Sequence, residues 1–153
     1  MKLWGNSNTS QRPVREVQPQ TRYREVTTYK GHILVVEDNP GVLNATEVFL
    51  SETGYKVTTA TSLAEAVEHA RSSPELDLLI TDYHLSNKET GKQVIAAVRE
   101  IRGPAFKAVV ITGDTYAAVH AFDGDACLCW LRKPIDSRQL VTVLDSFLAR
   151  PAG

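Results

Sequence analysis

Three mostly apolar runs that each end in polar residues constrain the fold of this chain more than any other feature. They are residues 32–36 before Glu37 and Asp38, residues 76–81 before Asp82, and residues 108–111 before Thr112. Such runs are typical of strands in a parallel sheet, because helices cover both faces of that sheet. Ligand sites of open parallel sheets lie at the carboxyl ends of the strands. We therefore expect Asp82 to be displayed at this edge rather than buried.

Helix signals separate these runs and predict the fold class. Two further strands are expected at 55–60 and at 127–131, the second before Arg132 and Lys133, and a short helix is expected at 115–122. Further helix starts are marked by capping residues: Asn39 before Pro40, Ser62 before Glu65, Thr90 before Gln93, and Asp136 before Gln139. Five strands that alternate with five helices indicate an α/β protein with a doubly wound parallel sheet.

The first predicted helix, 40–53, also allows a prediction of its buried face. Val42, Ala45 and Phe49 recur at helical spacing, which favours an inward stripe of these three residues with Leu50 beside it. Leu43 falls outside this stripe, so we expect it on the solvent side of the helix.

Composition and charge divide the chain into two parts. At 153 residues with 42% hydrophobic content, the chain is long enough to bury one core, which we place at 31–150. Residues 1–30 carry six Lys or Arg against two acids and show no sustained period, so we expect a polar, basic and disordered tail or linker. The sequence holds neither an apolar stretch of membrane-spanning length nor the apolar centre of a secretory signal. We therefore expect a cytoplasmic protein without membrane contact.

The acids at the predicted sheet edge require a compensating cation. Glu37, Asp38 and Asp82 would lie close together, and unpaired like charges at such a site are costly. An all-oxygen, partly hydrated site suits Mg²⁺. With Mg²⁺ and the cation of Lys133 offsetting the charge, an aspartate can act as a nucleophile toward phosphorus. The hydroxyl of Thr112 could hydrogen-bond a phosphoryl oxygen.

These residues resemble the receiver domain of a two-component response regulator. In that family an acidic pair follows the first strand, a phospho-accepting Asp the third, Ser or Thr the fourth, and Lys-Pro the fifth. Here Asp38, Asp82, Thr112 and Lys133 are separated by 44, 30 and 21 residues, which matches the family over about 31–150. The resemblance implies a flavodoxin-like (βα)5 fold whose five parallel strands stand in the order 2-1-3-4-5.

The resemblance also implies how the acids would act. Asp82 would accept a phosphoryl group from a histidine of a partner. The carboxylates of Asp38 and Asp82 and the backbone carbonyl of His84 would bind Mg²⁺ directly. Glu37 would act on the metal largely through water. Mg²⁺ is the one cofactor that we expect on this basis.

The remaining matched positions would read the phosphoryl group. Thr112 and Lys133 would contact it, and Trp130 would rotate with Thr112 as the aromatic switch, although it is bulkier than the Tyr or Phe common at this position. Two positions are specific to this chain. Ser86 stands where a proline is usual, and Asp114 occupies a variable position where we expect it to alter the lifetime of the phosphoryl group.

Two other functions are left open by the residues alone. A Mg²⁺-dependent phosphohydrolase could use Asp82 as its nucleophile, although His84 stands where the haloacid-dehalogenase-like arrangement has a second Asp. A flavin or dinucleotide binder is disfavoured, because the first strand is followed by acids and not by Gly-x-Gly-x-x-Gly. For a receiver we expect catalysis of its own phosphorylation and dephosphorylation, without turnover of a free substrate.

The chain ends soon after its last predicted helix, so we expect output through partner binding or onward phosphotransfer. A histidine kinase or a histidine phosphotransfer protein is the expected partner. A homodimer is a further option, and direct binding of nucleic acid is not expected. A free-standing regulator and the C-terminal receiver of a hybrid histidine kinase both fit. The polar tail and the sequence of residues 111–115 resemble those of hybrid-kinase receivers and favour the hybrid type.

Overall fold

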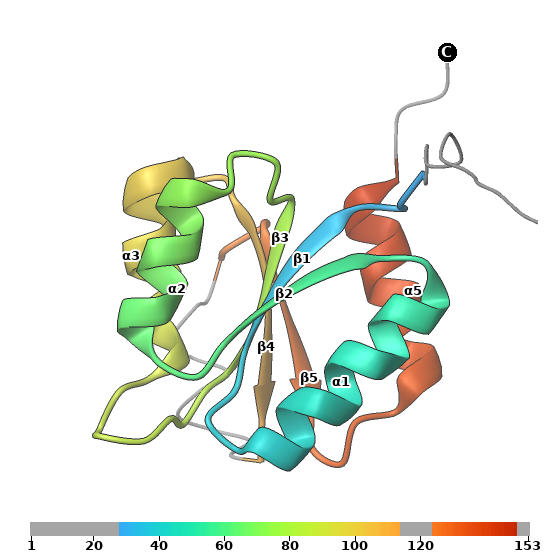
Figure 1. Cartoon of the computed structure of the whole chain (residues 1–153), viewed down its shortest axis with the longest axis horizontal. Coiled ribbons are helices and arrows are strands. Elements are labelled where there is room, and N and C mark those ends of the chain that lie inside the picture. The colour runs from blue at the N-terminus through green and yellow to red at the C-terminus, as the bar shows by residue number, and fades with distance from the viewer. Residues whose placement is uncertain (1–27, 114–123, 150–153) are drawn as a thin grey trace, which may run out of the picture.

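A parallel five-stranded sheet forms the centre of the protein in the computed structural model, which describes residues 28–113 and 124–149. The strands stand in the order β2-β1-β3-β4-β5 (Figure 1). They are β1 (His32–Val36), β2 (Lys56–Ala60), β3 (Leu78–Asp82), β4 (Lys107–Thr112) and β5 (Leu128–Arg132). The predicted α/β fold with strand order 2-1-3-4-5 is thereby confirmed.

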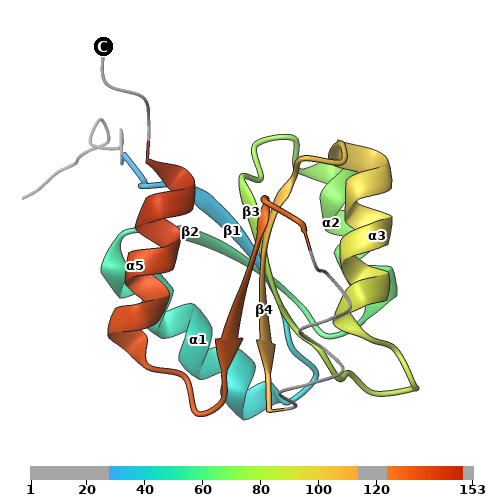
Figure 2. The same cartoon turned by 180° about the vertical axis from the view of Figure 1, so that it is seen from behind.

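The helices of the described ranges pack on both faces of the sheet. They are α1 (Pro40–Thr53), α2 (Leu63–Ser72), α3 (Gly91–Arg102) and α5 (Ser137–Leu148). Views from opposite sides show α2 and α3 on one face and α1 and α5 on the other (Figure 2). The sheet is therefore doubly wound, with helices covering both of its faces.

Alternating side chains of each strand feed two separate cores. Ile33 and Val35 lie in the core under α1 and α5, while Leu34 and Val36 lie in the core under α2 and α3. All four are at most 2% exposed, which is why β1 reads as an uninterrupted apolar run in the sequence. Each fully buried side chain of this kind stabilises the fold by roughly 1.5–3 kcal/mol.

The helix α1 begins where the sequence predicts, but it buries a different face. The side chain of Asn39 caps the helix by accepting the backbone N–H of Val42. Leu43 is 9% exposed whereas Val42 is 43% exposed, and Ala45 also faces solvent. The predicted inward stripe of Val42 and Ala45 was therefore wrong. Leu50 is fully buried, as predicted, and Leu43, two helical turns before it, fills the core in place of Val42, which turns the buried face by one residue.

Capping contacts fix the starts of the next two helices. Thr90 accepts the N–H of Gln93, and the side chain of Gln93 accepts the N–H of Thr90, which completes a capping box at α3. At α2, Ser62 accepts the N–H of Glu65, but the Glu65 carboxylate turns to the backbone N–H of Thr61. An N-cap of this kind is worth about 1 kcal/mol.

Glycine at position 91 lets α3 start directly against β3. The N–H of Gly91 donates to the carbonyl oxygen of Tyr83 at 2.6 Å. A Cβ atom on Gly91 would lie 2.7 Å from the backbone oxygen of Asp82, which is too close for any side chain. This approach holds the loop after β3 beside Asp82.

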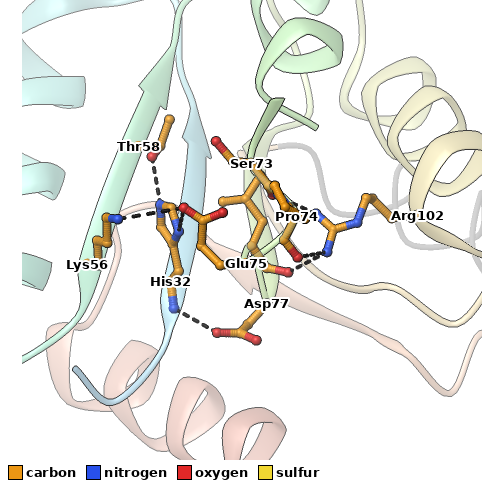
Figure 3. Close-up of polar contacts among 9 residues, drawn as sticks. His32, Lys56, Thr58, Ser73, Pro74, Glu75, Asp77 and Arg102 are labelled. Atoms are coloured by element: carbon orange, nitrogen blue, oxygen red, sulfur yellow. Dashed lines mark hydrogen bonds and ion pairs between the residues drawn. The ribbon is translucent and has the colours of Figure 1, made fainter. Parts of the chain in front are cut away.

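A separate polar network fixes the amino-terminal edge of the sheet (Figure 3). The ring Nε2 of His32 lies 2.7 Å from the hydroxyl of Thr58 on β2, and the backbone N–H of His32 donates to Asp77 at 2.9 Å. Arg102, at the end of α3, donates to the backbone carbonyls of three residues before β3: Ser73, Pro74 and Leu76. These contacts tie β1, β2, β3 and α3 together at the edge opposite Asp82.

Three predictions concern residues outside 28–113 and 124–149. They are the disordered tail over 1–27, the helix at 115–122 and the effect of Asp114 on phosphoryl lifetime. Within the described ranges, no helix combines the length and the apolar character needed to cross a membrane.

Candidate functional site

The polar strand ends meet at one edge of the sheet, at the bottom of Figure 1. β1 has β2 on one side and β3 on the other. The chain therefore moves to one side of β1 for β2 and to the other side for β3, which makes the edge between β1 and β3 the switch point. In open α/β sheets, ligands bind beyond the carboxyl ends of the strands at such a switch point. β1 runs into Glu37 and Asp38, and β3 ends at Asp82. The fold therefore brings these three acids to the position where a ligand is expected.

Glu37, Asp38 and Asp82 form one acidic cluster. One carboxylate oxygen of each residue lies within 4.8 Å of the other two. Glu37 is 8% exposed and Asp82 is 6% exposed, while Asp38 is half-buried. Because two of the three acids are shielded from water, their mutual repulsion is weakly screened. The cluster therefore lacks positive charge.

The pKa of Glu37 is raised, mainly because its carboxyl group is buried. Burial raises the pKa from its ordinary value of 4.5 to about 7, against a hydrogen bond from the backbone N–H of Asn39 that lowers it. The charge of Asp82 and the contact with Asp38 also act to raise it. At neutral pH Glu37 is therefore partly protonated, and a bound cation would favour its ionised form.

Asp82 is buried beneath Lys133, so the expectation of a displayed carboxylate was wrong. Lys133 Nζ lies 2.9 Å from Asp82 Oδ2, and the side chains are 46% and 7% exposed respectively. Lys133 follows β5 and reaches across the end of β4 to cover the acid. Burial alone would lower the pKa of Lys133, but the hydrogen bond and charge of Asp82 outweigh it and raise the pKa. Lys133 therefore stays charged and is the nearest cation to Asp82.

Asp38 is held by a residue that sequence reasoning did not assign to the site. The hydroxyl of Ser86 donates a hydrogen bond to Asp38 Oδ2. This hydrogen bond is the largest cause that lowers the pKa of Asp38. The contact joins residues 48 positions apart, so local sequence could not show it. The available signal was Ser86 itself, a hydroxyl at the position where response regulator receivers usually have proline.

Within the part of the chain that the structure describes, the backbone carbonyl of His84 makes no hydrogen bond to the opposite side of its loop. His84 forms an isolated antiparallel bridge with Thr90, and its neighbours on both sides make the backbone hydrogen bonds across the loop. In such a pair the peptide groups of the bridged residue point away from the partner strand. The carbonyl of His84 thus faces away from Thr90. The exposed ring of His84 packs edge-on against Tyr83, with centroids 4.9 Å apart.

Thr112 and Trp130 share the sheet face that α2 and α3 cover. Thr112 ends β4 and is fully buried, two residues after Val110, which lies in the core on that face. Trp130 pairs with Val110 in the neighbouring strand and packs against the same core. The ring of Trp130 lies 6.3 Å from that of Tyr83, the residue after Asp82. Sequence reasoning missed this contact of Tyr83, because it assigned Tyr83 no role at the site.

The oxygen donors at this edge fit Mg²⁺. The cluster offers carboxylate oxygens from three acids, and the loop after β3 can add the carbonyl of His84. Mg²⁺ prefers hard oxygen ligands and keeps some of its water, which the exposed side of Asp38 allows. A divalent ion would balance acids that Lys133 alone leaves in excess. Fold and site together define a doubly wound α/β protein with an acidic cluster at its switch point.

A family model places the chain among known proteins. Residues 33–145 match the response regulator receiver domain. This match spans more than half of the chain, and it covers the five strands from Ile33 onward and the three acids of the cluster. The chain belongs to the response regulator receiver domain family.

Individual relatives agree with this family. The transcriptional regulatory protein GlrR of Escherichia coli is 30% identical over 123 residues, which cover 79% of this chain and 27% of that protein. A response regulator receiver protein from Sinorhizobium medicae is 32% identical with a TM-score of 0.68, covering 77% of this chain and 94% of that one. The receiver domain of the hybrid histidine kinase CckA is 27% identical with a TM-score of 0.64, covering 77% and 99%. The chain spans between 24% and 35% of the curated relatives it matches.

Proposed function

We propose that the protein accepts a phosphoryl group on Asp82 from a phosphohistidine of a partner. The observation that carries the proposal is the surroundings of Asp82, a buried carboxylate with Lys133 at 2.9 Å and two further acids beside it. An aspartate that served stability alone would gain nothing from two neighbouring acids, because they repel it. The arrangement suits a nucleophile that works together with a cation.

The proposed reaction forms an acyl phosphate. A carboxylate oxygen of Asp82 bonds to phosphorus while the bond from phosphorus to the histidine nitrogen breaks. The electron pair of that bond leaves with the histidine ring, which takes a proton from water. Lys133 and the hydroxyl of Thr112 would then hydrogen-bond phosphoryl oxygens. Attack by water later releases phosphate and restores the carboxylate of Asp82.

Glu37, Asp38, Asp82 and the carbonyl of His84 would hold Mg²⁺ in this reaction. When bound, Mg²⁺ offsets the negative charge shared by the carboxylates and the phosphoryl group. The grouping of three carboxylates around one lysine supports this assignment, because the acids are left with excess negative charge. Burial of Asp82 also keeps bulk water away from the nucleophile.

We infer that phosphorylation is read on the sheet face that carries Trp130. A phosphoryl group adds up to about two negative charges at Asp82, which favours conformations with Thr112 and Lys133 drawn toward it. Trp130 lies on the same face as Thr112 and contacts the ring of Tyr83. A shift of Thr112 would therefore change the space available to the Trp130 ring.

The proposed partner is a histidine kinase or a histidine phosphotransfer protein, because the donor is a phosphohistidine. Similarity to the receiver domain of the hybrid histidine kinase CckA supports the C-terminal receiver of a hybrid kinase as the architecture. Output would then pass through protein partners, with no direct contact to nucleic acid.

Intact-mass measurement tests the proposed function. The protein is incubated with acetyl phosphate, with and without Mg²⁺, as the parent, as Asp82→Asn and as Asp77→Asn. We expect one phosphoryl increment that requires Mg²⁺, persists in Asp77→Asn at the opposite edge of the sheet, and disappears in Asp82→Asn. A parent that gains no increment would contradict the proposal. Continuous release of phosphate from an external phosphoester would favour a phosphohydrolase instead.

A further inference from the structure

We propose that Ser86 is a positioning residue that sets the Mg²⁺ affinity of the acidic cluster by holding Asp38. The inference rests on the proposed function, since it concerns the cation of the phosphoryl-transfer site. The hydroxyl of Ser86 donates to Asp38 Oδ2. A hydroxyl has one proton to donate, so it fixes the carboxylate through a single oxygen and leaves the second oxygen able to bind a cation.

A tight turn directs the hydroxyl of Ser86 toward Asp38. Asn87 and Lys88 both have left-handed backbone, at φ 61° and 63°, which is the signature of a type I′ turn. Ser86 stands at its start, and its carbonyl accepts the N–H of Glu89 at 3.2 Å. The N–H of Leu85 donates to the carbonyl of Glu89 at 3.0 Å. Ser86 therefore belongs to a hydrogen-bonded hairpin.

The hairpin is itself fastened to two other elements. Glu89 Oε1 accepts the N–H of Leu63, the first residue of α2, at 2.9 Å. At its base, Gly91 donates to Tyr83 directly after β3. Left-handed backbone at a lysine costs about 1–2 kcal/mol, which these anchors must overcome. The hairpin that carries Ser86 is therefore held by contacts to the start of α2 and to the end of β3.

This support matters because Asp38 is the most exposed acid of the cluster. A carboxylate near solvent rotates freely unless a partner holds it, and cation binding must then order it. Hydrogen-bond partners of metal ligands typically change metal affinity by about 10- to 100-fold. At this exposed site we expect a smaller effect, roughly 3- to 10-fold.

Titration with Mg²⁺ by calorimetry tests the inference. The proteins compared are the parent, Ser86→Ala, Ser86→Thr and, as a matched control, Ser72→Ala at the far end of α2. We expect Ser86→Ala to weaken Mg²⁺ binding roughly 3- to 10-fold. Ser86→Thr keeps the hydroxyl and should bind close to the parent, and Ser72→Ala should bind like the parent.

A second readout separates positioning from general damage to the site. With acetyl phosphate as donor, Ser86→Ala should need more Mg²⁺ for half-maximal phosphorylation but reach the rate of the parent at saturating Mg²⁺. If the parent binds Mg²⁺ and Ser86→Ala binds it equally well or more tightly, the inference is wrong. The proposed function would not be affected by that result. A lower maximal rate with unchanged Mg²⁺ affinity would overturn the inference too. A parent that binds no Mg²⁺ would contradict the proposed function and this inference together.

Discussion

Asp82 and Glu37 are both buried carboxyl groups, yet different partners surround them. Asp82 has the ammonium of Lys133 at 2.9 Å. Glu37 has the backbone N–H of Asn39 at 3.0 Å and two acids nearby. Burial raises the pKa of Glu37 to about 7, so its full ionisation depends on added positive charge. This difference suits Asp82 as the nucleophile and Glu37 as a group that responds to the cation.

Gly91→Ala tests how closely α3 must approach Asp82. The new Cβ would lie 2.7 Å from the backbone oxygen of Asp82, so helix and strand would have to separate. We expect the free energy of unfolding to fall by about 1–3 kcal/mol, as for overpacked cores, measured by urea denaturation. The matched control is Gly41→Ala near the start of α1, whose Cβ meets only the side chain of Asn39 at 3.4 Å. It should leave stability unchanged or slightly increased. A Gly91→Ala protein as stable as the parent would contradict the close approach.

At the scale of elements, the two edges of the sheet hold charge in different ways. The carboxyl edge gathers three acids around one lysine. At the amino edge, His32 lies in β1 at 5% exposure, and its Nδ1 is a buried atom without a hydrogen bond among the described residues. Glu75 lies 3.7 Å from that nitrogen and 3.6 Å from Lys56 (Figure 3). This edge therefore holds a titratable group in the interior.

His32 should contribute a loss of stability as the pH falls. Burial, then the charge of Lys56, lowers the pKa of His32 below its ordinary value of 6.5, with a small effect of His69 in the same direction. Glu75 and Asp77 act against this shift. Below pH 6.5 the unfolded chain takes up a proton that the folded chain does not, so folding loses stability there and keeps it above. The slope for one proton is at most about 1.4 kcal/mol per pH unit.

Denaturation between about pH 5.0 and pH 7.5, a window that reaches about one and a half units below the ordinary pKa of His, measures this loss. His32→Gln should reduce the loss on acidification. Glu75→Gln should increase the loss of stability. The charge of Glu75 acts to raise the pKa of His32, so its removal lowers this pKa further. If the parent and His32→Gln lose stability in parallel, His32 does not control the acid response.

At the scale of the whole molecule, much of the site follows from the order of elements along the chain. Apolar runs predict the strands, and a doubly wound sheet then brings the ends of β1 and β3 together. The grouping of Glu37, Asp38 and Asp82 therefore follows from sequence alone. So does the approach of Lys133 to Asp82, once β5 is placed at the sheet edge beyond β4.

Other features depend on geometry that local sequence does not contain. A shift of one residue decides which face of α1 is buried. Val42 and Leu43 are both apolar, so the sequence does not show which of them faces the core. The burial of Asp82 depends on a side chain 51 residues later in the chain. The contact of Ser86 with Asp38 requires the exact path of a type I′ turn against a separate loop. Long-range register and turn geometry, not composition, decide these cases.

Location of the phosphoryl group tests the central claim most directly. The protein is treated with acetyl phosphate and Mg²⁺, the acyl phosphate is reduced with borohydride to an alcohol, and the position of the resulting homoserine is mapped by peptide mass spectrometry. Homoserine at position 82, and its absence when Mg²⁺ is omitted, is the predicted result. Homoserine at another acid, or an unmodified Asp82 in a protein that has gained a phosphoryl group, would contradict the assignment of Asp82 as the acceptor.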